Sequence, residues 1–141
     1  MIVLDTNVLS ELMRPTPSAA VEGWVGSQPV TSIFISAITE AELRYGLALL
    51  PEGRRQRQLV AEAEAMLAED FAGRILPFDS PAAAAYARIA AARRLSGRPI
   101  SQADAQIAAI AASRGASLAT RNVADFVGCG IDVVDPWNAR S

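Results

Sequence analysis

Ile2-Val3-Leu4-Asp5-Thr6-Asn7 opens the chain: three apolar residues run directly into a carboxylate, and a turn follows. A short, continuous apolar run is typical of a parallel strand that is covered on both faces of its sheet. Longer segments with helical spacing separate this run from four others, which are Ile33–Ile35, Arg74–Leu76, Ser117–Ala119 and Asp132–Val134. The alternation predicts an α/β fold, with a central parallel β-sheet of about five strands flanked by helices.

Four longer helices are predicted between these strands, each bounded by a cap or a stop residue. They run from Thr39 to Leu50, from about Arg54 to Ala68, from the cap Ser80 to Gly97, and from the cap Ser101 to Gly115. Because only a few residues separate the first two, we expect them to pair as a helical hairpin. No linker, repeat or block of charge divides the sequence, so residues 1–141 are predicted to form a single domain.

The side chains that the sequence lacks exclude several kinds of chemistry. Its 141 residues include no His, one Cys (Cys129) and 13 basic residues, all of them Arg. Catalytic triads and zinc sites that use His are therefore excluded, as are Schiff bases and P-loops, which use Lys. If the protein is an enzyme, we expect its 15 acidic residues to carry the chemistry. The matching cation is one that prefers oxygen ligands, such as Mg²⁺ or Mn²⁺.

The net charge and the first residues indicate how the protein could bind a polyanion and in which compartment we expect it. The formal net charge is −2, so binding of a polyanion would depend on local Arg clusters rather than on the overall field. One such cluster, which we interpret as a solvated helix face, consists of Arg88, Arg93, Arg94 and Arg98. Met1–Asp5 lacks the basic segment of a signal peptide, and the uncharged stretch 23–39 contains Gly and Pro. We therefore expect a soluble, cytoplasmic protein.

Three acidic residues fall where predicted parallel strands end. Asp5 follows the first strand, Glu42 lies in the helix after the second, and Asp104 lies in the first turn of the Ser101 helix. Because ligands bind at the carboxyl edge of an open parallel sheet, we expect these carboxylates to converge there, where a cation would offset their repulsion. Each acid also has a local interpretation. Asp5 can cap a helix, and Glu42 and Asp104 can complete capping boxes that begin at Thr39 and Ser101.

A further polar group follows the fourth predicted strand. Asn122 and Asp125 both offer oxygen ligands, and Arg121 is placed to meet a phosphate. The local alternative is an Asx turn at Asn122 and a cap or solvent role for Asp125. The identity of a fourth ligand is thus open between these two residues.

Four segments taken together resemble the acidic motifs of the PIN-domain family. They are Leu4-Asp5-Thr6-Asn7, Ala41-Glu42-Leu43-Arg44-Tyr45-Gly46, Ala103-Asp104-Ala105-Gln106-Ile107-Ala108-Ala109, and Ala119-Thr120-Arg121-Asn122 with Asp125-Phe126. The likeness covers nearly the whole chain in order and spacing, and it is closest to the VapC and FitB toxin-type branch. Phe71–Asp79 and Pro136-Trp137 add to it. It implies the PIN-domain form of the α/β fold, a Rossmann-like three-layer α/β/α arrangement.

The resemblance implies a Mg²⁺- or Mn²⁺-dependent endoribonuclease, the toxin of a type II, VapBC-like toxin–antitoxin system. By position, Asp5, Glu42 and Asp104 correspond to the family's catalytic and metal-binding acids, and Asn122 and Asp125 are candidates for a fourth ligand. Asn122 stands where the family often has an acid, which leaves the number of bound metals open. In the implied mechanism, a metal-activated water attacks the RNA phosphodiester and leaves a 5′ phosphate.

The resemblance also implies partners. Toxins of this branch form homodimers and are neutralised by a small, VapB-like antitoxin whose C-terminal segment enters the acidic crevice. RNA is the implied substrate, and Arg44 and Arg121 are candidates for contacts with its phosphates.

Two other hypotheses stay open. One is a PIN-type module that binds RNA or protein without cleaving it. The other is a phosphotransfer protein with Asp5 as the nucleophile, although Asn7, and not a second acid, stands two residues after Asp5.

Overall fold

Five short parallel strands form one sheet at the centre of the molecule. In the computed structural model, which describes residues 1–139, the strand order is β3-β2-β1-β4-β5. The strands are β1 (Ile2–Leu4), β2 (Ile33–Ser36), β3 (Ile75–Leu76), β4 (Ser117–Ala119) and β5 (Val133–Val134). Central β1 pairs with β2 on one side and with β4 on the other, and every pairing is parallel. The predicted strands are confirmed, with ends that differ by at most one residue.

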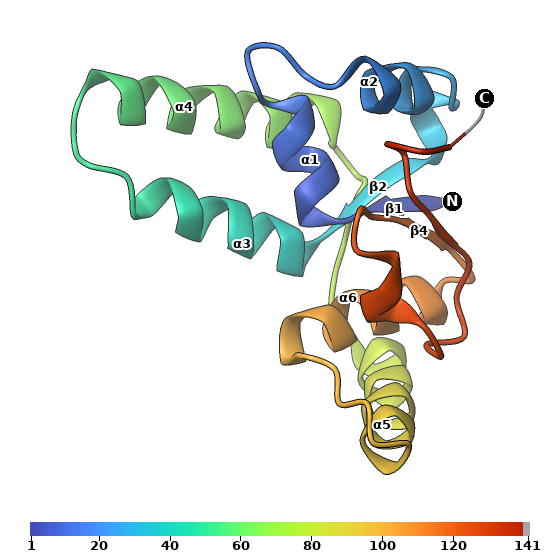
Figure 1. The fold of residues 1–141 in the computed structure, drawn as a ribbon. Coiled ribbons are helices and arrows are strands. Elements are labelled where there is room, and N and C mark those ends of the chain that lie inside the picture. The colour runs from blue at the N-terminus through green and yellow to red at the C-terminus, as the bar shows by residue number, and fades with distance from the viewer. Residues whose placement is uncertain (140–141) are drawn as a thin grey trace.

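The described residues form six α-helices around this sheet (Figure 1). They are α1 (Thr6–Leu12), α2 (Ala19–Gly26), α3 (Ala37–Ala48), α4 (Arg54–Ala65), α5 (Ser80–Leu95) and α6 (Gln102–Ser113). Two of them, α3 and α4, project beyond the sheet. Shorter helical turns are η1 (Val30–Ser32), the π-helical η2 (Met66–Asp70) and η3 (Val123–Phe126). Among the described residues, none of these helices combines the length and the apolar character that crossing a membrane requires.

The two faces of the sheet build two separate cores. Successive residues of a strand point to opposite faces. Val3 therefore packs with residues of α5 and α6, whereas Leu4 packs with residues of α1 and α2. Both side chains are fully buried. This burial on both faces explains why β1 is a continuous apolar run rather than an alternating one, and it confirms the predicted α/β/α layering.

The start of α3 differs from the prediction. The helix begins at Ala37 rather than at Thr39, because the buried Ser36 hydroxyl is its cap and accepts a hydrogen bond from the Thr39 amide at 3.0 Å. Ser36 is also the last residue of β2, and its extended backbone places the hydroxyl over the first turn of the helix. The capping box from Thr39 to Glu42 is therefore wrong, and Glu42 is not occupied in a cap.

The caps of α5 and α6 give one correction and one confirmation. Asp79, rather than Ser80, caps α5, since its Oδ1 accepts a hydrogen bond from the Ala82 amide at 3.1 Å. Ser101 caps α6 as predicted, and its hydroxyl accepts from the Asp104 amide at 3.2 Å. This bond uses the backbone of Asp104, and a hydrogen bond with Ser101 also lowers the pKa of the Asp104 carboxyl group, against the larger effect of burial.

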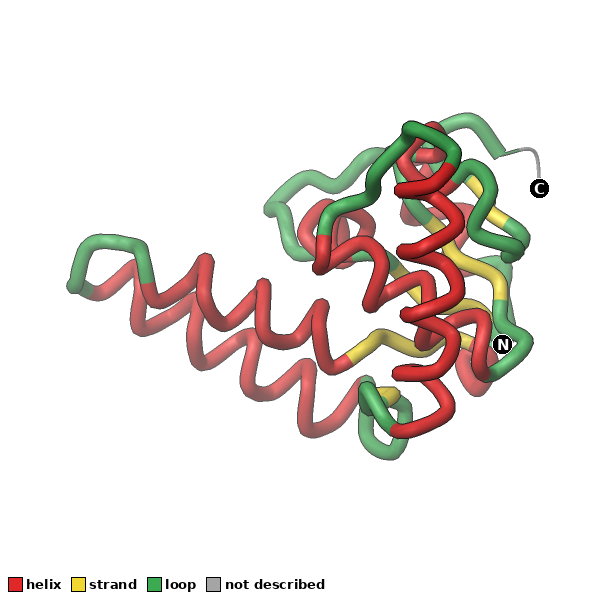
Figure 2. Tube along the Cα trace, turned by 90° about the horizontal axis from the view of Figure 1, so that it is seen from below, coloured by secondary structure: helices red, strands yellow, loops and turns green. Residues whose placement is uncertain are grey.

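Helices α3 and α4 form the predicted hairpin, which extends away from the other helices (Figure 2). Arg44 on α3 joins the two helices, because it forms ion pairs with Glu40 of its own helix at 2.8 Å and with Glu64 of α4. Helix α4 ends at Ala65 and continues directly into η2, so the predicted end at Ala68 falls inside that turn.

Glu11 on α1 is a buried carboxylate that fixes the loop between α1 and α2. It accepts hydrogen bonds from the Ser18 amide at 2.9 Å and from the Arg14 guanidinium at 3.3 Å. The bond from the Ser18 amide lowers the pKa of Glu11 below its ordinary value, and Arg14 acts in the same direction against the effect of burial.

We predict that Glu11→Gln lowers the free energy of unfolding at neutral pH, because the amide lacks the charge that strengthens both hydrogen bonds. A carboxylate whose native pKa is lowered stabilises the fold above its unfolded pKa, and this contribution is lost as the pH falls through the native value. In urea unfolding, the difference from the wild type should be largest near neutral pH, begin to shrink near the ordinary glutamate pKa of about 4.3, and vanish only below the lowered native value. Glu52→Gln, at an exposed position between α3 and α4, is the control. A deficit at Glu11 that does not change with pH would contradict the electrostatic explanation.

Candidate active site

Asp5 lies at the carboxyl end of the central strand with only 5% of its surface exposed. Its Oδ1 accepts a hydrogen bond from the Thr6 amide at 2.8 Å. Its Oδ2 accepts from the Thr120 hydroxyl at 2.7 Å and from the Asn7 amide group at 3.2 Å. The bond from Thr6 makes Asp5 the cap of α1, as its local interpretation predicted. The cap does not account for Oδ2, whose partners are the side chain of Asn7 in the same helix and that of Thr120 after β4.

Thr120, directly after β4, connects the ends of the two central strands. Its fully buried hydroxyl donates to Asp5 and accepts from the Asn7 side chain and from the Asn122 amide, both at 3.1 Å. The Asn7 side chain in turn accepts from the Arg121 amide at 3.1 Å. Neither Thr120 nor Asn7 was predicted as a site residue, although both belong to the acidic motifs. The available signal was a hydroxyl placed directly after a buried apolar strand, which requires a partner.

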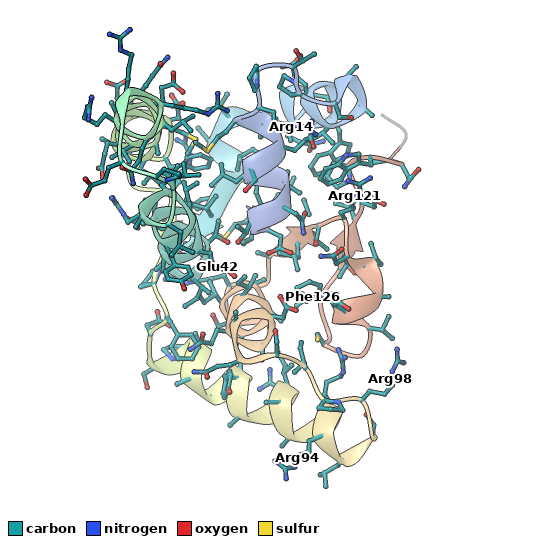
Figure 3. All side chains as sticks on the ribbon, turned by 60° about the vertical axis from the view of Figure 1, so that its left-hand side comes forward. Arg14, Glu42, Arg94, Arg98, Arg121 and Phe126 are labelled. Carbon is teal, nitrogen blue, oxygen red and sulfur yellow. The ribbon has the colours of Figure 1, made fainter. Side chains whose placement is uncertain are left out.

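Glu42 reaches the same edge of the sheet from α3. Its Oε1 accepts a hydrogen bond from the Thr6 hydroxyl at 2.6 Å, and the same hydroxyl lies 3.1 Å from that of the buried Thr39. Figure 3 shows Glu42 where α3 approaches α1 and α6, and the side chain is exposed. Neighbouring Glu40 turns to Arg44 instead. Of the two acids of this turn, Glu42 is the one at the candidate site.

Asp104 and Asp125 complete the acidic edge. Burial raises the pKa of Asp104, and the negative charges of Asp5 and Asp125 raise it further. Asp104, which is half-buried, and the exposed Asp125 line one cavity of about 200 Å³, together with Ser101 and Arg93. Asp125 is therefore electrostatically coupled to the predicted acids.

The pKa of Asp5 is raised as well. Burial is the largest cause, and the charge of Glu42 adds to it, whereas the hydrogen bonds from Thr120, Thr6 and Asn7 act in the opposite direction. Asp5 thus interacts with Glu42 and with Asp104 at this edge of the sheet, so the predicted convergence holds for these two pairs of acids.

The oxygen ligands at this edge fit a hard divalent cation, with part of its coordination left to water. Within the described residues, no three His, Cys, Asp or Glu side chains lie close enough together to form a three-ligand metal site. Mg²⁺ is commonly bound by one or two carboxylates and retains several waters, so a closed set of three is not required. Asp5 and Asp104, which lie at this edge and of which Asp5 raises the pKa of Asp104, are the candidates for these carboxylates.

Neither arginine that was predicted to contact RNA phosphates lies among the acids. The Arg121 guanidinium stacks on Trp137, 4.8 Å from the ring centre. Its charge contributes to lowering the pKa of Glu11. Figure 3 shows Arg121 and Glu42 on opposite sides of α1 in that view. Arg44 is engaged by Glu40 and Glu64 in the hairpin. A phosphate contact by either arginine remains a prediction, and it would compete with these interactions.

The fold and the acidic edge agree with the comparisons with known proteins. The PIN domain model matches residues 2–126, a range that contains every predicted acid of the site. The chain belongs to the PIN-domain family.

Within this family, the chain is similar to VapC- and FitB-type proteins. It is 44% identical over 137 residues to the VapC ribonuclease Y4jK of Sinorhizobium fredii, covering 97% of this chain and 98% of that protein. It is 44% identical over 138 residues to the toxin FitB of Neisseria gonorrhoeae, covering 98% and 99%. The crystal structure of FitAcB from Neisseria gonorrhoeae superposes with a TM-score of 0.93 at 43% identity, covering 99% of this chain and 100% of that one.

We predict that Asp104→Asn raises the free energy of unfolding at pH 7, by up to about 1 kcal/mol, because it removes a charge that burial and neighbouring acids disfavour. A carboxyl group whose native pKa is raised stabilises the fold fully below its unfolded pKa, and this contribution is lost as the pH rises through the native value. Urea unfolding in EDTA should therefore show the gain at neutral pH and none in strong acid. Asp132→Asn, at an exposed position beside β5, is the control. A loss of stability in Asp104→Asn at pH 7 would contradict the repulsion described here.

Proposed function

We propose that this protein is a divalent-metal-dependent endoribonuclease and the toxin of a VapBC-like toxin–antitoxin system. The observation that carries the proposal is the arrangement of Asp5, Glu42 and Asp104 at the carboxyl edge of a PIN-domain sheet. A relative that is 44% identical over nearly its whole length is a VapC ribonuclease, and another is the toxin FitB. The absence of His from the sequence favours acid- and metal-based chemistry over imidazole catalysis.

Asp5 and Asp104 would hold Mg²⁺ or Mn²⁺, with Glu42 binding directly or through a water. For a fourth ligand we favour Asp125 over Asn122, because Asp125 lines the same cavity as Asp104 and its charge raises the pKa of Asp104. When bound, the cation would lower the pKa of a water molecule and offset the negative charge of the phosphodiester.

The chain's own residues orient these acids. Thr120 and Asn7 direct hydrogen bonds at Oδ2 of Asp5, and the amide of Thr6 fixes Oδ1, so the carboxylate is held in one orientation. The Thr6 hydroxyl, next to Asp5 in the chain, donates a hydrogen bond to the Glu42 carboxylate. Mutation of residues that orient a metal ligand in this way typically lowers metal affinity or activity by about 10- to 100-fold.

We also propose a small antitoxin protein as partner and a homodimer as the assembly of the toxin. The similarity to the toxin FitB supports the partner. A groove of about 340 Å³ between α1, α2 and η2 offers apolar surface for it, with Leu12, Val25 and Phe71 in its lining.

We predict that the protein, purified free of antitoxin, cleaves RNA in Mg²⁺ or Mn²⁺ and not in EDTA. Asp5→Asn and Asp104→Asn should each reduce the rate by about a hundredfold or more, because each removes a ligand charge. Cleavage of total cellular RNA, with end analysis for 5′ phosphates, measures this, and Asp132→Asn should retain activity.

Two results would favour the other hypotheses. Folded wild-type protein that binds RNA but cleaves none with any divalent metal would indicate a binding module. An acid-labile phosphate on Asp5 would indicate phosphotransfer.

A further inference from the structure

Arg93 on α5 is a buried charge that the proposed function does not use. Only 8% of it is exposed, so the interpretation of the arginine cluster as a solvated helix face is wrong for this residue. It is right for Arg94, which is exposed on α5, whereas Arg98 is exposed but lies in the loop after the helix. Figure 3 shows both of these at the end of the α5 region that lies away from Glu42. One arginine of the cluster therefore has a different role from its neighbours.

Backbone carbonyl groups, and not carboxylates, surround the Arg93 guanidinium. Its Nε donates to the Arg98 carbonyl at 2.7 Å, and its Nη1 donates to the carbonyls of Asp125 and Val127 at 2.8 and 3.0 Å. Nη1 also lies 3.7 Å from the Cys129 sulfur. None of the ion pairs in the described part of the chain involves Arg93.

These bonds attach α5 to two segments that carry acids of the site. The first runs through η3 to Cys129 and includes Asp125, and it lies against the arginine. A Cβ at Gly128 would lie 3.8 Å from Cδ of Arg93, and Phe126 and Cys129 of the same segment are buried. The second segment runs from Arg98 to the cap of α6 and leads directly into Asp104.

The charge of Arg93 is permanent. A guanidinium does not lose its proton in a protein, and burying it without partners is costly. Because backbone carbonyls accept its hydrogen bonds, Arg93 forms no ion pair with Asp104 or Asp125 in the described part of the chain. Its positive charge lowers the pKa of Asp104, against the larger effect of burial. Arg93 thus lies behind the acids as a fixed counter-charge that occupies neither of them.

We propose that Arg93 is a positioning residue. It fixes the backbone at Asp125 and at the start of α6 so that the carboxylates of Asp104 and Asp125 face one cavity, and its charge offsets part of their repulsion. Arg93, Asp104 and Asp125 line that cavity together with Ser101, as described above. The proposal rests on the proposed function, in which these carboxylates bind Mg²⁺ or Mn²⁺.

Three variants test it in the full-length protein. Arg93→Met keeps an apolar stem but removes the charge and the donors. Arg93→Lys keeps the charge but loses the planar set of donors that reaches both segments. Arg94→Met, one residue along the same helix and exposed, is the matched control. Mn²⁺ affinity by calorimetry, kcat and KM for RNA cleavage, and amide hydrogen exchange are measured on each.

We expect Arg93→Met to weaken Mn²⁺ binding about tenfold or more and to lower kcat, with little change in the KM for RNA. Arg93→Lys should recover part of the affinity, and hydrogen exchange in both variants should accelerate in 98–104 and 122–129. Arg94→Met should match the wild type in every measurement.

Wild-type Mn²⁺ affinity in folded Arg93→Met would overturn the proposal, as would an equal loss in Arg94→Met. If Arg93→Met does not fold, Arg93→Lys decides, and unchanged affinity and unchanged exchange in that variant would overturn it. If the wild type itself binds no Mn²⁺, the proposed function fails, and hydrogen exchange alone decides the positioning role. Exchange that is faster only in the two segments supports it, and unchanged exchange overturns it.

Discussion

The hydrogen bond from Thr120 to the buried carboxylate of Asp5 joins the ends of the two central strands, and the candidate site depends on it. Asp5 follows β1 directly, and its carboxylate is almost fully buried. Burial of a charge lowers the stability of a fold unless hydrogen-bond donors satisfy its oxygens. The donors come from the residue that ends β4 and from the first turn of α1. The same hydroxyl accepts from Asn7 and Asn122, so the loops around Asp5 have little freedom to move apart.

Electrostatic repulsion is the second constraint at this edge. Glu42 raises the pKa of Asp5, and Asp5 and Asp125 raise that of Asp104. The fold tolerates this arrangement because a parallel sheet directs the carboxyl ends of its strands to one edge, where α3 and α6 also begin. Acids kept together against their mutual repulsion are typical of sites that bind a cation, and a protein accepts such a loss of stability at a functional site.

The sequence predicted the strands well, since burial on both faces leaves continuous apolar runs that periodicity detects. It predicted caps less well. Ser36 belongs to a strand by its pattern and caps α3 by its position, and only the geometry of the turn separates these roles. Arg93 and Arg94 are adjacent and chemically identical in the sequence, yet one is buried and the other is exposed. Periodicity did not resolve that difference, because the covering η3 segment lies more than 30 residues along the chain.

By itself, the sequence determined the order of strands and helices, the absence of imidazole and amine chemistry, and the three acids that follow strands or begin helices. These are local properties, written in apolar runs and in residue types. Only the tertiary structure decided which groups meet: that Thr120 satisfies Asp5, that Thr6 holds Glu42, and that Arg121 stacks on Trp137 away from the acids. Contacts between residues more than 100 positions apart, such as Asp5 and Thr120, follow from strand order and register, which the packing of two cores on one sheet fixes.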